Sequence, residues 1–173
     1  MSTPVLIFTG PVGAGKTTTA SAASELLEET GIPHALIDMD HLRNCIACPE
    51  RDPFHMLLGF QNVAALWQNY HAYGAQRLIV ADVVETRENI AQWRNAIPNA
   101  GIKIARLDAG IDTLHRRLAE RGEVGASLQW HQARAIEVRA LMGARRLEDA
   151  LIHTEGRTPC EVAREALERF GWL

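Results

Sequence analysis

The sequence has few of the features that mark secreted, membrane-bound or nucleic-acid-binding proteins. Only three of its 173 residues are cysteine, an odd number that gives no disulfide framework and favours a reducing, cytoplasmic setting. The formal net charge is −3, so no basic surplus argues for binding to nucleic acid. No apolar run approaches the roughly 20 residues that a membrane-spanning helix needs. The sequence therefore predicts no membrane association, and nucleic acid is not an expected partner.

The sequence also shows no sign of being divided into several domains. The sequence has no internal repeat and no low-complexity segment, and residues 1–4 run directly into the first predicted strand, leaving no room for a signal peptide. With 47% hydrophobic residues, the chain is long enough to bury one core. We expect a single domain over residues 1–173, present as a monomer or a homodimer.

One stretch stands out, because residues 10–17 read Gly-Pro-Val-Gly-Ala-Gly-Lys-Thr. They satisfy the complete pattern of a phosphate-binding loop, with glycine at the first and sixth positions, then lysine and threonine. The loop follows the apolar run 5–8 and precedes the Ala-, Leu- and Glu-rich segment 16–29, so it joins a predicted strand to a predicted helix. Glycines let backbone N–H groups surround a phosphate, and the helix N-terminus adds a favourable partial charge.

This loop predicts a binding site for ATP and Mg²⁺. Lys16 is expected to reach the β- and γ-phosphates, and the Thr17 hydroxyl is expected to bind Mg²⁺. The residues of the loop and of the helix start that we expect to contact the nucleotide are Gly10, Gly13, Ala14, Gly15, Lys16, Thr17 and Thr18.

Four later apolar runs predict further buried strands, and helical segments lie between them. The predicted strands are 34–38, 77–82, 102–107 and 151–154. The predicted helices are 54–73, 88–96, 114–122, 130–147 and 158–170. Strands that alternate with helices predict a three-layer α/β/α domain around a five-stranded parallel sheet.

Charged residues follow the second predicted strand, and open parallel sheets bind their ligands at that edge. Asp40 and Arg43 are three residues apart, so one helical turn would let both face the same cleft. Asp40 could accept a proton from a substrate hydroxyl, while Arg43 could hold an anionic group or the transferring phosphate. The alternative is that Asp40 only caps a short helix and Arg43 is a solvated surface charge.

Asp82 ends the third predicted strand after four apolar residues. An acid in this position is expected to bind the Mg²⁺ shell or to position the attacking group. Asp38 and Asp82 are therefore alternatives to Asp40 as the catalytic base. Glu85 and Arg87 lie at the same sheet edge and are second-rank candidates.

Residues 41–74 are expected to form the substrate-binding part of the domain, and they include an irregular, proline-punctuated connection at 44–53. His41, Cys45, Cys48 and His55 raise the alternative of a zinc site. Only one Cys-x-x-Cys is present and the histidines lie outside the usual finger spacings, so we favour free thiols.

Two arginines end the predicted helix 114–122. Arg117 and Arg121 are one turn apart, so one could stack on a nucleotide base while the other pairs with phosphates. The next residues, 122–131, are expected to form a short lid.

Together these motifs resemble the P-loop small-molecule kinases, which include adenylyl-sulfate kinase, gluconate kinase, chloramphenicol phosphotransferase and the kinase domain of polynucleotide kinase. The matching parts of the sequence are the loop 10–17, the pair Asp40 and Arg43, the segment 117–121, and the C-terminal segments 154–159 and 161–164. Segments 62–67 and 130–137 are also similar to uncharacterised bacterial ATP-binding proteins, and that likeness supplies no substrate.

The resemblance implies more than the residues alone. It implies the strand order 2-3-1-4-5, with Asp40 as the base toward the acceptor. It also places Arg117 on adenine and Arg121 on the phosphates. Arg157, in the C-terminal motif, is likewise expected near the nucleotide.

The sequence thus predicts a kinase that transfers a phosphoryl group from ATP, with Mg²⁺, to a hydroxyl group of a small molecule. The predicted catalytic residues are Lys16, Asp40, Arg43 and Arg121, and the predicted metal ligands are Thr17 and Asp82. One alternative is a nucleotide-operated ATPase or switch, although neither a water-positioning residue nor a partner surface is evident. The other is a polynucleotide or nucleotide kinase, which Asp40 and Arg43 favour and the negative net charge opposes.

Overall fold

The computed structural model describes residues 2–47, 50–52, 54–122 and 124–173. Its strands are β1 (Thr3–Thr9), β2 (His34–Asp38), β3 (Arg77–Ala81), β4 (Ala100–Asp108) and β5 (Ala150–His153). Its helices are α1 (Lys16–Glu29), α2 (Met39–Leu42), α3 (Met56–Ala72), α4 (Arg87–Ala96), α5 (Ile111–Glu120), α6 (Gly125–Arg145) and α7 (Pro159–Arg169).

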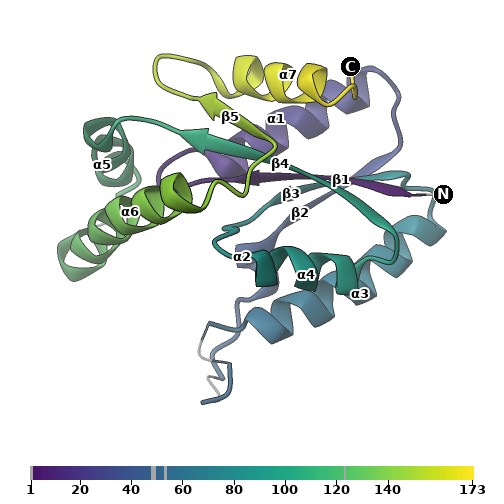
Figure 1. Cartoon of the computed structure of the whole chain (residues 1–173), viewed down its shortest axis with the longest axis horizontal. Coiled ribbons are helices and arrows are strands. Elements are labelled where there is room, and N and C mark those ends of the chain that lie inside the picture. The colour runs from purple at the N-terminus through teal and green to yellow at the C-terminus, as the bar shows by residue number, and fades with distance from the viewer. Residues whose placement is uncertain (1, 48–49, 53, 123) are drawn as a thin grey trace.

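The strands form one parallel sheet in the order β2-β3-β1-β4-β5. Helices α1 and α7 cover one face and α3 and α4 cover the other, while α5 and α6 lie beyond the carboxyl ends of the strands (Figure 1). The predicted three-layer α/β/α fold and its strand order are confirmed. Every strand ends at the same edge, so that edge is the place where loops from distant parts of the sequence meet.

The central strand β1 explains why the first apolar run has no polar residues. Alternate side chains of a strand point to opposite faces, and both faces of this sheet are covered. Leu6 and Phe8 accordingly pack in the core on the side of α1 and α7, and Val5 and Ile7 pack on the side of α3 and α4. All four side chains are fully buried.

The start of α6 differs from the sequence-based expectation. Helix α6 begins at Gly125, so residues 125–131 of the expected lid form its first turns. Its N-cap residue, Val124, makes no side-chain cap, so no capping signal marks the start of the helix in the sequence. Residue 123 of the expected lid lies outside the described part of the chain.

The capping role that we considered for Asp40 was wrong. Helix α2 is capped by Asp38, whose Oδ1 accepts a hydrogen bond from the backbone N–H of Asp40 at 3.0 Å. Asp38 can do this because it still has the extended backbone of β2. The Asp40 side chain therefore does not cap α2.

No helix in the described ranges is long and apolar enough to cross a membrane.

Candidate active site

The loop from Gly10 to Thr17 is pressed against β4 and α5, and glycine is required at the points of closest approach. A Cβ atom on Gly10 would lie 2.5 Å from the carbonyl oxygen of Leu107. Gly13 has a φ of +85°, and a Cβ atom there would lie 3.0 Å from the carbonyl oxygen of Leu114. The two glycines thus allow a conformation that side chains would prevent.

The start of α1 presents unpaired backbone donors to this loop. Gly15 is the N-cap, and the first helical hydrogen bond runs from Thr19 N–H to Gly15 O at 2.9 Å. The amides of residues 16–18 precede that bond, and no acidic side chain occupies the first turn. The Thr18 hydroxyl donates to Gly15 O at 3.0 Å and stays beside the loop. This helix N-terminus therefore has the donors and the partial charge that hold a phosphate.

Lys16 folds back over the loop. Its Nζ donates to the carbonyl oxygens of Gly10 at 3.1 Å and Pro11 at 3.2 Å. Burial lowers the pKa of Lys16 to about 8, and the positive charge of Arg121 adds to that effect, although Asp40 opposes it. The ammonium group is thus held by two neutral carbonyls, and no carboxylate of the described residues is bonded to it and would compete with a phosphate.

Thr17 contacts an acid from the end of β2. Its hydroxyl donates to Asp38 Oδ2 at 2.7 Å, while the other Asp38 oxygen caps α2. A hydroxyl beside a carboxylate is an oxygen donor set that suits Mg²⁺.

Asp82, the acid after β3, is bound differently. Its Oδ2 accepts from Trp93 Nε1 at 2.9 Å and its Oδ1 accepts from Val83 N–H at 2.8 Å. Burial raises the pKa of Asp82, although these two hydrogen bonds oppose that rise. Asp82 and Asp38 each accept a hydrogen bond on both carboxylate oxygens, and Asp38 is the acid that contacts Thr17.

Asp40 and Arg43 do face one another, as their spacing predicted. Arg43 Nη2 forms an ion pair and hydrogen bond with Asp40 Oδ1, and Nη1 lies 2.8 Å from the sulfur of Met56. The Asp40 side chain is 71% exposed and that of Arg43 is 18% exposed. Arg43 is thus largely buried and held by Asp40 and Met56, whereas the Asp40 carboxylate is exposed to solvent.

One pocket of about 680 Å³, a volume that accommodates a small molecule, is lined by Lys16, Thr17, Asp40 and Arg43. Its inner side includes Gly13, Gly15, Lys16, Thr17 and Arg121. Its other side is formed by α2, the start of α3, the β3–α4 connection and α6. We call this side the outer wall, and the residues of it that matter below are Asp40, Arg43, Phe54, Met56, Glu85, Asn89, Trp130, Arg134 and Glu137.

The two lid-side arginines have different surroundings. Arg121 lines the pocket beside Lys16. Arg117 Nη1 donates to Gly13 O at 3.3 Å and to Thr154 Oγ1 at 2.9 Å, while Nη2 donates to Thr154 O at 2.9 Å. Arg117 therefore joins the phosphate-binding loop to the turn after β5.

Arg157 is turned away from this region. It donates to Glu165 Oε2 at 2.6 Å, to Glu161 O at 3.0 Å and to His153 O at 3.1 Å. It is not among the described residues that line the pocket. These contacts indicate a role in holding α7 against β5, and its expected contact with a nucleotide stays a prediction.

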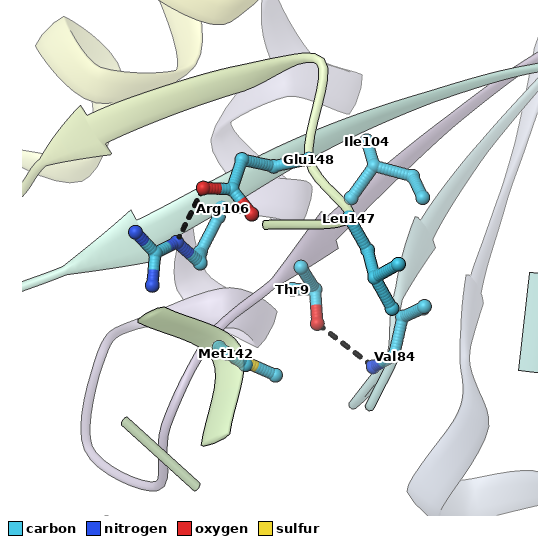
Figure 2. Close-up of a pocket in the computed structure, with 7 residues that line it drawn as sticks. All are labelled: Thr9, Val84, Ile104, Arg106, Met142, Leu147 and Glu148. Atoms are coloured by element: carbon cyan, nitrogen blue, oxygen red, sulfur yellow. Dashed lines mark hydrogen bonds and ion pairs between the residues drawn. The ribbon is translucent and has the colours of Figure 1, made fainter. Parts of the chain in front are cut away.

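A second cavity lies between β4, the β3–α4 connection and α6, and Figure 2 shows the residues that line it. Arg106 Nε lies 3.1 Å from Glu148 Oε1, an ion pair outside hydrogen-bond geometry, and Val84 N–H donates to Thr9 Oγ1 at 2.8 Å. The volume of about 10 Å³ matches one water molecule. This cavity is too small for a substrate, and the contacts of its polar groups join β4 to the α6–β5 connection and β1 to the β3–α4 connection.

Several residues that line the outer wall were not singled out from the sequence as site candidates. Arg134 forms ion pairs with both Glu85 and Glu137, the latter at 2.9 Å. Trp130, Arg134 and Glu137 recur at the spacing of one helix face, which was a usable signal. Cys45, in the segment considered for zinc, is exposed, and Cys48 lies outside the described residues.

The chain is similar to known kinases in part of its sequence and in its whole fold. Residues 2–50 match the family model of adenylylsulphate kinase. The fold resembles the tunicamycin resistance protein of Deinococcus radiodurans, with a TM-score of 0.67 and 17% identity over 99% of this chain and 96% of that one. No curated protein is significantly similar to the chain in sequence.

Two further solved structures have the same fold. The APS kinase of Mycobacterium tuberculosis, in complex with AMPPNP and APS, has a TM-score of 0.63 and 19% identity, covering 98% of each chain. A gluconokinase from Sinorhizobium meliloti has a TM-score of 0.63 and 18% identity, covering 98% of this chain and 93% of that one. The predicted resemblance to P-loop small-molecule kinases is confirmed, and the chain has the P-loop kinase fold.

Proposed function

We propose that this protein is a kinase that transfers the γ-phosphoryl group of ATP to a hydroxyl group of a small molecule. The observation that carries the proposal is that Lys16 and Asp40 line one cavity of about 680 Å³. One side has the cation and backbone donors that hold phosphates, and the other has an exposed carboxylate. The named functions of the structurally similar kinases support the same reaction class.

Each group has a distinct task in this reaction. The amides of residues 16–18 and the Lys16 ammonium bind the phosphates and offset the charge of the transferring group, with Arg121 beside them. Asp40 accepts the proton of the acceptor hydroxyl as that oxygen forms its bond to phosphorus. Arg43 orients the Asp40 carboxylate by pairing with one of its oxygens.

Mg²⁺ fits the donor set beside the loop. The Thr17 hydroxyl would hold it, with the Asp38 carboxylate as its partner in the place that we first assigned to Asp82. When bound, the ion supplies charge neutralisation for the phosphates. We expect Asp38→Asn to raise the Mg²⁺ concentration for half-maximal activity by roughly 10- to 100-fold.

Asp82→Asn is the matched comparison for the metal assignment. It should lower the melting temperature, because the amide cannot accept both buried hydrogen bonds, and leave the Mg²⁺ requirement nearly unchanged. Titration of activity with Mg²⁺ and thermal melting of both variants measure these effects. A raised Mg²⁺ requirement in Asp82→Asn, with an unchanged one in Asp38→Asn, would identify Asp82 as the metal ligand.

The reaction itself is tested with a mixture of hydroxyl compounds, ATP and Mg²⁺, with phosphorylated products detected by mass. We expect at least one compound to gain a phosphoryl group, and Lys16→Ala and Asp40→Asn to suppress that product. ATP hydrolysis that no hydroxyl compound accelerates would instead favour the nucleotide-operated switch.

A further inference from the structure

The charged groups of the outer wall are already paired with one another. Arg43 pairs with Asp40, and Arg134 pairs with both Glu85 and Glu137. The wall therefore sets three carboxylates against two guanidinium groups, a surplus of one negative charge among its Asp, Glu and Arg side chains.

An acidic acceptor would have to break one of these pairs. Arg43 and Arg134 are 18% and 28% exposed, so both are held in partly desolvated positions. The backbone of Glu85 is also held in place, because its carbonyl oxygen accepts a hydrogen bond from Arg145 Nη1 at 2.6 Å. Separating such pairs leaves a charge without its partner, which costs more than an exposed pair contributes. The cations of the inner side, Lys16 and Arg121, face the phosphates of the donor under the proposed function.

The remaining surface of the outer wall is apolar and aromatic. Phe54 and Trp130 line the pocket and are 72% and 57% exposed, values that are high for such large apolar side chains. Met56 lies in the same wall, with its sulfur against Arg43. These side chains would lose water contact only when a ligand with an apolar part covers them.

A neutral donor completes this surface. Asn89 Oδ1 accepts from Glu85 N–H, Thr86 N–H and the Thr86 hydroxyl in the capping box of α4. Its Nδ2 donates no hydrogen bond to another of the described residues, and the side chain lines the pocket. An amide N–H of this kind suits a hydroxyl or carbonyl oxygen of an uncharged ligand.

From this wall we propose the class of the acceptor, an inference that rests on the proposed kinase function. The acceptor is an uncharged or cationic hydroxyl compound with an apolar ring, such as an aromatic amino alcohol, and it is neither a carboxylic acid nor a phosphate ester. The paired arginines disfavour an anion, the surplus carboxylate favours an amine, and Phe54 with Trp130 covers the ring.

Matched acceptors test this proposal. One trio is 3-phenylpropane-1,2-diol, phenylalaninol and 3-phenyllactate, and a second is glycerol, serinol and glycerate, which lack the ring. Amino alcohols, nucleosides, sugars and sugar acids extend the panel, with phosphorylated products measured by mass in the presence of ATP and Mg²⁺. We expect the products to come from the uncharged and cationic compounds and to favour those with a ring.

Two charge variants are expected to change the preference between acidic and cationic acceptors in opposite directions. Glu137→Gln removes an exposed carboxylate, so the kcat/KM ratio of acidic to cationic acceptors should rise by about tenfold. Arg134→Gln leaves both glutamates without their cation and should move the same ratio in the opposite direction. Glu168→Gln is the control, because it makes the same charge change at an exposed position on α7, outside the pocket.

The outcomes separate the two proposals. Products drawn mainly from the acids, or a ratio that neither pocket variant moves, would overturn the acceptor class while phosphoryl transfer stands. No product from any member of the panel, with ATP bound, would overturn the kinase function and the acceptor class with it.

Discussion

Apart from Arg121, the inner side of the pocket is one continuous segment that offers mainly backbone groups, whereas the outer wall is assembled from side chains of separate elements. Gly13 and the amides at the start of α1 belong to a stretch of consecutive residues. Glu85 and Arg134 form an ion pair across 49 positions of the sequence. Backbone donors recognise a phosphate whatever molecule carries it. Side chains can be exchanged singly, so the outer wall is where one kinase fold can acquire different acceptors.

The inner side is broken most severely by Lys16→Ala, which removes a cation from the phosphates in the transition state. We expect kcat to fall by at least about 100-fold. Steady-state kinetics with any accepted hydroxyl compound measure the loss. Lys103→Ala is the control, since that exposed lysine pairs with Asp149 at 3.3 Å outside the pocket. A normal kcat in the Lys16 variant would mean that the loop has no catalytic role.

The outer wall is tested by Asp40→Asn, which keeps the size of the side chain and removes its ability to accept the proton. We expect phosphoryl transfer to fall by roughly 100-fold, at the lower end for a general base because a loose transition state needs less proton transfer. ATP affinity should stay nearly unchanged, because Asp38 caps α2 and the Asp40 side chain is exposed. The melting temperature should fall slightly, because Arg43 loses its charged partner. Transfer at the unmutated rate would make Asp38 or Asp82 the next candidate base.

The same contrast determined what the sequence could predict. The phosphate-binding loop was readable because its glycines encode local backbone conformations, such as the φ of +85° at Gly13. The strands were readable because both faces of the sheet are covered, which requires continuous apolar runs such as 5–8.

Side-chain directions at the sheet edge could not be predicted in this way. Asp38 and Asp82 both follow apolar strands, and only the packing of α4 brings Trp93 onto Asp82 and leaves Asp38 for Thr17. Residues 125–131 could not be assigned to α6 for a related reason, because that helix begins without a capping side chain.

The pH dependence of ATP affinity examines the inner side without changing a residue. The pKa of Lys16 is lowered to about 8 by burial, and bound phosphates would raise it. Below pH 8 the lysine already carries its proton, so affinity should be flat. Above pH 8 binding must take up a proton, so Kd should rise by up to about tenfold per pH unit.

Calorimetric titration with ATP between pH 7 and pH 9.5 measures this effect. Lys16→Met should bind ATP weakly and show no such slope. A slope that persists in Lys16→Met would place the titrating group elsewhere.

The smallest expected effect is that of Arg117→Ala. Arg117 lies where the inner side of the pocket meets the turn after β5. Arg117 contacts Gly13 O and two oxygens of Thr154, so its guanidinium is held at the border of the phosphate-binding loop. If its flat face also stacks on adenine, its loss weakens ATP binding by about 1 kcal/mol, a roughly fivefold rise in the KM for ATP with kcat nearly unchanged.

Arg121→Ala should instead lower kcat, because phosphate charge grows in the transition state. Arg116→Ala is the matched control, since this neighbouring arginine is exposed and pairs with Glu120 at 3.7 Å. The same change in KM from both Arg117→Ala and Arg121→Ala, with kcat unaffected, would show that the two arginines do not have separate roles.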